Sequence, residues 1–281
     1  MKKFSIVVPV HNEEKFLISF LESVCSQSLL PEEMVLIDDN SDDRSKKIMV
    51  GYQDKKDFIR VFSRKSSTEH MPGPKVVNAF LFGYSKLTKS YDFILKLDAD
   101  LMLPPKYFES IINAFSHPKV GVVGGILVEL SSTGRWENAH PMKMDHVRGG
   151  LKAYSIECYK KIGGLIPEMG WDTIDEILAS YYGYEVRVLN NLKVKHLRPI
   201  GNAYSRNSSY LQGAAFYKMR YGIIIGILAC LKGFLIKKSL SFLFWSIIGF
   251  LNGYLKKEPF VVSKRQGGFI RKFRVKSIFR P

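Results

Sequence analysis

Cysteine is scarce in this 281-residue chain, which contains only Cys25, Cys158 and Cys230. They lie far apart and form no CxxC spacing, so the pattern favours neither a disulfide framework nor a structural zinc site. A long apolar run is missing near the N-terminus, where residues 5–10 are too short for the hydrophobic region of a signal peptide. We therefore expect the chain to fold in a reducing compartment, with its main domain in the cytosol.

Negative charge is also in short supply, because 42 Lys and Arg residues face 26 Asp and Glu residues and leave a formal net charge of +16. Half of this excess follows residue 255, where basic residues are interleaved with apolar ones. No nucleic-acid-reading module is visible, so nucleic acid is not an expected partner. With 46% hydrophobic residues, the chain can bury one main core and support an appendage.

Strand-like and helix-like segments alternate through the first half of the chain. Strands are expected at residues 4–10, 34–37, 58–62 and 120–123, and another in the apolar run that starts at Tyr91 and stops at Asp98. Helices are expected at residues 16–25, after residue 43, at 76–84 and at 107–115. This alternation predicts an α/β fold with a doubly wound, mostly parallel sheet.

Polar residues follow three of these strands, at 11–14, 38–43 and 98–100. Sheets of this kind bind ligands beyond the carboxyl ends of their strands, so these loops are candidates for a site. Asp98 and Asp100 could turn their oxygens toward a divalent cation whose other ligands are phosphate and water. The structural alternative is helix capping, in which Ser41 or Asp42 caps the next helix and nearby acids complement its dipole.

The segments VVPVHNEE (residues 7–14), LIDDNSDD (36–43) and KLDAD (96–100) occur in an order that resembles family 2 of the glycosyltransferases. The resemblance covers roughly residues 4–200. It implies a GT-A fold, an inverting reaction, a nucleotide-diphosphate sugar donor, and Mg²⁺ or Mn²⁺ at the Asp-x-Asp motif. Such a metal would act as a Lewis acid on the departing diphosphate.

The resemblance also assigns roles to individual positions of this chain. Asp39 would contact the nucleotide base, Asp98 would lie near the ribose, and Asp100 would be the main metal ligand. Asp98 and His196 would join Asp100 at the metal, although a lone histidine is more often structural. The other positions expected to bind the nucleotide sugar are Pro9, Asn12, Glu14, Lys75, Ala99 and Gly150.

A carboxylate must also remove the proton from the acceptor hydroxyl. In the family the base commonly lies in a Glu-Asp pair about three helical turns before a Gly-Tyr pair. Asp172 has this spacing from Gly183-Tyr184, although Trp171 stands where the family usually has Glu. We expect Asp172 to be the base, with Asp175 as the second candidate. The structural alternative makes Asp172 an N-cap.

Beyond residue 200, segments 221–236 and 239–255 are rich in apolar residues and bounded by lysines. Each is at or below the length of about 20 residues that spans a bilayer. A two-pass hairpin would place its lysine turn on the wrong side, so a helical pair in the membrane plane is favoured, attached peripherally or monotopically. The alternative is a soluble helical subdomain or an oligomer interface.

Two domains are therefore expected, a GT-A catalytic domain at residues 1–205 and a membrane-associated helical appendage at 206–281. The predicted function is sugar transfer to a lipid-linked or cell-envelope glycan acceptor at the cytoplasmic face of the inner membrane. A catalytically silent nucleotide-binding or membrane-scaffold relative is the second hypothesis. The sequence leaves open the donor base and sugar, the acceptor, the linkage and the oligomeric state.

Overall fold

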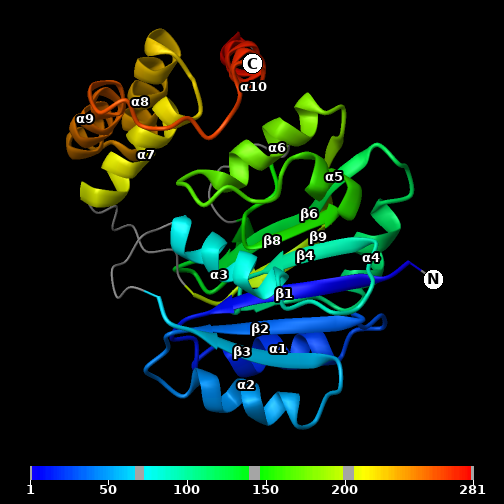
Figure 1. The fold of residues 1–281 in the computed structure, drawn as a ribbon. Helices are drawn as coiled ribbons and strands as arrows, with labels where there is room; N and C mark the ends of the chain where they lie inside the picture. Colours follow the sequence, from blue (N-terminus) through cyan, green and yellow to red (C-terminus); the bar gives the residue numbers. More distant parts are fainter. Residues whose placement is uncertain (1, 67–72, 139–145, 199–205, 280–281) are drawn as a thin grey trace.

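The computed structural model describes residues 2–66, 73–138, 146–198 and 206–279 (Figure 1). The expected alternation of the first half is confirmed, with β1 matching the prediction at both ends. The elements of this half are β1 (Phe4–Val10), α1 (Leu17–Cys25), β2 (Glu33–Asp39), α2 (Ser45–Gln53), β3 (Ile59–Arg64), α3 (Pro74–Tyr84), β4 (Phe93–Leu97), β5 (Leu101–Met102), α4 (Tyr107–Ala114) and β6 (Val120–Leu130).

The second half adds strands that the sequence did not suggest. Its elements are β7 (Trp136–Asn138), β8 (Leu151–Ser155), α5 (Ile156–Lys161), α6 (Trp171–Tyr181), β9 (Glu185–His196), α7 (Arg206–Lys218), α8 (Ile223–Lys237), α9 (Leu240–Leu255) and α10 (Lys264–Phe279). Helices α8 and α9 were predicted, whereas α7 and α10 were not.

The strands form one sheet in the order β3-β2-β1-β4-β8-β6-β9-β5, with β7 paired to β6. The half from β3 to β4 is parallel, as predicted. The other half is mixed. β6 and β9 run parallel, but β8 runs antiparallel to both β4 and β6, and β5 runs antiparallel to β9, so the prediction of a mostly parallel sheet is wrong for these pairs. The antiparallel β8 brings the loop before it to the edge where β4 ends.

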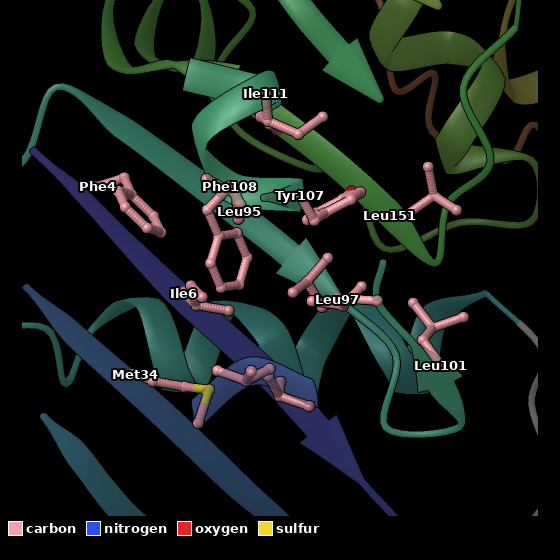
Figure 2. Packing of buried hydrophobic residues seen from close by; sticks show 14 of the residues in the cluster. Phe4, Ile6, Met34, Leu95, Leu97, Leu101, Tyr107, Phe108, Ile111 and Leu151 are labelled. Atoms are coloured by element: carbon pink, nitrogen blue, oxygen red, sulfur yellow. The ribbon is translucent and has the colours of Figure 1, made fainter. Parts of the chain in front are cut away.

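Helices cover both faces of the sheet (Figure 1). Alternate residues of β1 and β4 point to opposite sides, as the strand period requires. Phe4 and Leu95 pack with α1 and α4 on one face, where the rings of Phe4 and Phe108 lie 5.1 Å apart (Figure 2). Val7 and Ile94 pack with α3, α5 and α6 on the other face.

The C-terminal helices share the second of these cores. Ala215 of α7, Met219 directly after this helix and Ile270 of α10 are buried in the cluster that contains α6. Helices α7 and α9 approach closely at glycines, since a Cβ on Gly213 would lie 1.8 Å from a backbone oxygen of α9. Among the described segments, none of the helices is both long enough and apolar enough to cross a membrane.

Candidate active site

The ends of β1, β2 and β4 surround one cleft of about 330 Å³. Residues from separate loops meet there because parallel strands end at the same edge of the sheet. The lining residues are Pro9, Val10, His11, Glu13, Asp39, Gly73, Lys75, Val76, Asp98, Ala99, Asp100 and Arg198. The structure thus brings together Pro9, Asp39, Lys75, Asp98, Ala99 and Asp100 among the predicted positions.

Asn12 and Glu14 lie outside this lining and hold loops together. The Asn12 side chain accepts a hydrogen bond from the Asp42 amide at 3.0 Å, and the Asn12 amide donates to the Ser41 hydroxyl at 3.2 Å. Glu14 pairs with Arg44 at 3.2 Å and faces a different hollow, between α1 and α2. Their positions support the loop walls of the cleft.

The capping predicted for Ser41 or Asp42 is wrong, because α2 begins at Ser45 and its N-cap is Arg44. The amide of Ser45 donates instead to Asp43 Oδ1 at 2.8 Å. Ser41 is too early in the chain to reach the first turn, and its hydroxyl is used by Asn12.

Asp39 forms the buried end of the cleft. Its Oδ1 lies 3.2 Å from Nε of Arg64, and its backbone oxygen accepts a hydrogen bond from His11 Nδ1 at 2.8 Å. The carboxylate is therefore fixed in direction at the end of β2.

Asp98 is held at the end of β4 by its neighbours. Its carboxylate bonds Lys96 Nζ, and its amide donates to the Gly150 oxygen at 2.9 Å. A Cβ on Gly150 would lie 2.6 Å from Asp98 Oδ2, so a side chain at position 150 would displace this carboxylate. Gly150 was predicted to belong to the donor site. It does not line the cleft, but it contacts Asp98, which does.

Asp100 belongs to a second charged group in the cleft. Its Oδ2 lies 3.3 Å from His196 Nε2 and 3.4 Å from Arg198 Nε, while Arg198 also pairs with Glu13 at 2.5 Å. Burial would raise the pKa of Asp100. The hydrogen bond and the charge of His196, together with the charge of Arg198, outweigh this effect and lower the pKa. Burial raises the pKa of Glu13 to about 7 against the opposing effect of Arg198.

The prediction that Asp98, Asp100 and His196 together hold a metal is not matched by their arrangement. Within the described part of the chain, no three His, Cys, Asp or Glu side chains are grouped so that they could hold an ion. Asp98 is turned toward Lys96, whereas Asp100 and His196 are adjacent. Asp100 Oδ1 is buried and has no hydrogen-bond partner among the described residues, so this pair retains one buried, unsatisfied carboxylate oxygen.

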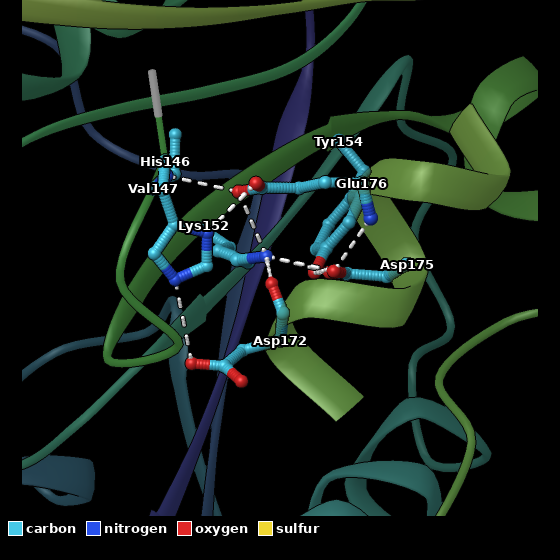
Figure 3. A network of polar contacts seen from close by, with 7 residues as sticks. All are labelled: His146, Val147, Lys152, Tyr154, Asp172, Asp175 and Glu176. Atoms are coloured by element: carbon cyan, nitrogen blue, oxygen red, sulfur yellow. Dashed lines mark hydrogen bonds and ion pairs between the residues drawn. The ribbon is translucent and has the colours of Figure 1, made fainter. Parts of the chain in front are cut away.

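A second cluster surrounds the start of α6 (Figure 3). The N-cap of this helix is Gly170, so Asp172 lies in the first turn and is not the cap. Its side chain is 31% exposed, and its Oδ2 lies 3.7 Å from His146 Nε2. Burial would raise the pKa of Asp172, but the ion pair with His146 and the positive charges of Lys152 and Arg148 lower it.

Asp175, the second candidate for the base, occupies a different environment. It is 2% exposed, and both carboxylate oxygens bind Lys152 Nζ, at 2.8 and 2.9 Å. Tyr154 donates to the same carboxylate at 2.5 Å (Figure 3). A base must be within reach of the acceptor hydroxyl, so the burial of Asp175 favours Asp172 as the base. In this structure Asp175 is the counter-ion of Lys152.

The two clusters meet at Gly149 and Gly150. A Cβ on Gly149 would lie 2.7 Å from the Trp171 ring and 3.1 Å from Cβ of Asp172, whereas one on Gly150 would meet Asp98. The absence of side chains at both positions thus lets the end of β4 and the start of α6 approach one loop from two sides.

Several residues of these clusters were given no role in the site by the sequence. They are Glu13, Lys96, His146, Lys152, Glu176 and Arg198. Glu13 and Lys96 lie in the segments that carry the resemblance, and Arg198 could have been noticed as a cation two positions after His196. His146, Lys152 and Glu176 are recognisable only by their partners in space.

The comparisons with known proteins define the class. The chain belongs to the family described as Glycosyl transferase family 2, whose model matches residues 5–171. It is therefore a glycosyltransferase, as the sequence resemblance indicated.

Curated relatives match a shorter stretch. The undecaprenyl-phosphate 4-deoxy-4-formamido-L-arabinose transferase of Photorhabdus laumondii is 30% identical over 118 residues, covering 40% of this chain and 34% of that protein. The transferase of the same name from Serratia proteamaculans is also 30% identical over 118 residues, covering 40% and 33%. The match thus spans about a third of each relative's length.

Solved structures share the mixed α/β GT-A-like fold. The mannosyltransferase PcManGT from Pyrobaculum calidifontis, in complex with GDP-Man and Mn²⁺, has a TM-score of 0.56 at 13% identity and covers 99% of this chain and 81% of that one. GalNAc-T7 with UDP, GalNAc and Mn²⁺ has a TM-score of 0.59 at 17% identity and covers 92% of this chain and 58% of that one. S. aureus TarS 1-349 with UDP-GlcNAc has a TM-score of 0.55 at 19% identity and covers 90% of this chain and 73% of that one.

Proposed function

We propose that the cleft binds a nucleotide-diphosphate sugar and that the enzyme transfers the sugar, with inversion, to a hydroxyl of a lipid-linked or other cell-envelope glycan. The observation that carries this proposal is the meeting of Asp39, Asp98 and Asp100 in one cleft whose edge also approaches Asp172. The glycosyltransferases PcManGT and TarS were solved with GDP-Man and UDP-GlcNAc, which supports a donor of this class.

The donor would lie with its base toward Asp39 and its diphosphate toward Lys75 and Arg198. Both cations line the cleft. Arg198 pairs with the carboxylates of Glu13 and Asp100, and it could pair with a bound diphosphate instead. Asp100 and His196 would hold Mg²⁺ or Mn²⁺, since oxygen and imidazole nitrogen suit these ions and Asp100 Oδ1 is otherwise unsatisfied. Such an ion supplies Lewis-acid stabilisation of the leaving diphosphate.

Asp172 would act as the general base. Its side chain is partly exposed, and its lowered pKa keeps it ionised at neutral pH, when it can accept the acceptor's proton. The attacking oxygen would approach the anomeric carbon from the face opposite the diphosphate, which yields inversion. Trp171, packed against Gly149, would form the floor between donor and acceptor.

The acceptor side would face a membrane. Residues 1–205 would form the catalytic domain, and 206–281 an appendage attached peripherally or monotopically to the cytoplasmic face of the inner membrane. Large apolar side chains are exposed on α8 and α9, among them Ile224 at 77% and Leu255 at 79%. Exposed lysines such as Lys238 and Lys256 border them and suit anionic headgroups. The curated relatives are named for undecaprenyl-phosphate, which is a lipid, and this supports a lipid-linked acceptor.

The test is thermal unfolding with UDP-, GDP- and dTDP-sugars, with and without Mn²⁺, for the wild type, Asp100→Ala and the control Asp57→Ala. Asp57 is exposed and lies far from the cleft lining. A ligand at about 100 times its dissociation constant adds about 2.7 kcal/mol to the free energy of unfolding. We expect one nucleotide to stabilise the wild type and Asp57→Ala in the presence of Mn²⁺, and Asp100→Ala to lose the effect.

Absence of any shift in well-folded protein would refute the donor assignment. The alternative of a catalytically silent membrane scaffold would then account better for the exposed apolar helices. A nucleotide that stabilises equally with and without Mn²⁺ would refute the metal assignment alone.

A further inference from the structure

His146 lies between two carboxylates of α6. Its Nδ1 donates to Glu176 Oε2 at 2.8 Å, and its Nε2 faces Asp172 Oδ2 at 3.7 Å (Figure 3). Asp172 and Glu176 are four residues apart, so they project from the same face of the helix. One imidazole ring therefore contacts both.

Glu176 fixes the direction of this ring. Its Oε1 accepts a hydrogen bond from the Val147 amide at 2.9 Å and lies 3.0 Å from Lys152 Nζ. The same carboxylate thus grips the His146 side chain and the backbone that follows it. With Nδ1 held by Glu176, the opposite nitrogen is aimed at Asp172.

The charges around the ring favour an imidazolium. Asp172 and Glu176 supply two negative charges from α6, while Lys152 from β8 and Arg148 from the preceding loop supply positive charge. Burial would lower the pKa of His146, but the ion pair with Asp172 and the hydrogen bond to Glu176 raise the pKa to about 9. The ring is therefore protonated at neutral pH.

We propose that His146 is a positioning residue that, held by Glu176, orients the Asp172 carboxylate toward the acceptor and keeps it ionised until the acceptor hydroxyl arrives. This inference rests on the proposed role of Asp172 as base. The transferred proton goes from the acceptor oxygen to Asp172, and the proton on His146 stays in place. Glu176 acts through His146 and does not touch substrate.

The proposal determines the sign of two pKa changes. Without the imidazolium, Asp172 loses the positive charge of its ion-pair partner, so its pKa rises. Without the negative charge of Glu176, the imidazolium loses a stabilising neighbour, so the pKa of His146 falls. A ring that merely fills space would leave both values unchanged.

The experiment follows both groups by NMR as a function of pH, using the carboxyl carbon of Asp172 and the ring of His146. The variants are His146→Gln and Glu176→Gln. The control is His117→Gln, because His117 is exposed and lies in the turn between α4 and β6. We expect the Asp172 titration to move to higher pH in His146→Gln and the His146 titration to move below about 9 in Glu176→Gln. His117→Gln should move neither. An unchanged Asp172 titration in folded His146→Gln would overturn the proposal.

Hydrolysis of UDP-, GDP- and dTDP-sugars, measured as nucleoside diphosphate released, separates this inference from the proposed function. Asp172→Asn should lose about 10²–10⁴-fold in rate, the usual contribution of a general base. His146→Gln should lose less, about tenfold to a hundredfold, with the acidic limb of its pH profile moved upward and the donor KM unchanged. A fully active Asp172→Asn would refute the base assignment itself. An inactive Asp172→Asn beside a His146→Gln of wild-type profile would refute the role of His146 alone.

Discussion

Two neighbouring glycines leave the space in which separate parts of the candidate site meet. Gly149 faces Trp171 and Asp172, and Gly150 faces Asp98, so each position leaves room for a different part of the site. Neither contact depends on an unusual backbone angle. Both depend on the space that a missing Cβ leaves.

Replacing Gly150 by alanine is expected to weaken donor binding. The new Cβ would lie 2.6 Å from Asp98 Oδ2, so the carboxylate must rotate away from its bond to Lys96, and overpacking of this kind costs about 1–3 kcal/mol. Titration calorimetry with the nucleotide sugar that stabilises the wild type would measure the loss. Gly51→Ala is the control, because nothing lies within 4 Å of its Cβ. Equal affinity in Gly150→Ala and wild type would contradict the proposed place of Asp98.

The acids at the ends of strands were predictable because topology alone brings such ends to one edge. Which of two adjacent residues faces the cleft was not predictable. Asn12 has a left-handed backbone with φ of 56°, and the chain then turns Glu13 into the cleft and Glu14 away from it. His146 and Glu176 are 30 positions apart and meet only through the packing of α6. No local pattern encodes such a contact.

At the scale of elements, amphipathic helices and apolar strands were predicted well, and β8 and β9 were not. β8 contains the buried Lys152, which reads as a surface residue until its carboxylate partners on α6 are known. The twelve residues of β9 include several polar side chains, so alternation is weak. Helix α10 is strongly basic, and no helix was predicted from its own residues.

Helices α7 and α9 form a tightly packed pair whose stability depends on small residues. A Cβ on Gly249 would lie 2.0 Å from the backbone oxygen of Tyr210, and backbone cannot rotate away as a side chain can. We expect Gly249→Ala to lower the free energy of unfolding by about 1–3 kcal/mol. Denaturant unfolding would measure this. Gly268→Ala on α10, whose nearest neighbour is the flexible end of Arg271 at 4.0 Å, should be neutral or slightly stabilising. A Gly249→Ala protein as stable as wild type would show that the pair is not rigid.

At the scale of the whole molecule, apolar exposure is concentrated at one end. The exposed large apolar residues of α8 and α9 are Ile223, Ile224, Ile227, Leu228, Leu231, Leu235, Ile236, Leu240, Phe244, Leu251, Tyr254 and Leu255. Apolar area of this extent usually marks a surface that meets a partner or a membrane.

We expect the protein to sediment with vesicles containing phosphatidylglycerol, and less so as salt rises, because both apolar insertion and lysine attraction contribute. The double variant Ile224→Ser, Leu255→Ser should bind about tenfold more weakly or worse, since each lost side chain removes about 1.5–3 kcal/mol when fully buried. Ile18→Ser, on the exposed face of α1, is the matched control. Vesicle binding that the double variant retains in full would contradict the membrane assignment.

The pairing of β4 with β8 also has a consequence for the order of folding. Lys96 and Lys152 are direct partners in this antiparallel register, and both are buried. Directly opposed like charges destabilise a strand pair, and the compensating carboxylates Asp175 and Glu176 arrive only with α6. We therefore expect the parallel half to assemble once β4 has been synthesised, and β8 to join it only together with α6, which emerges from the ribosome after it. The edge of the sheet that carries the candidate site would then be completed only when this strand and this helix pack together.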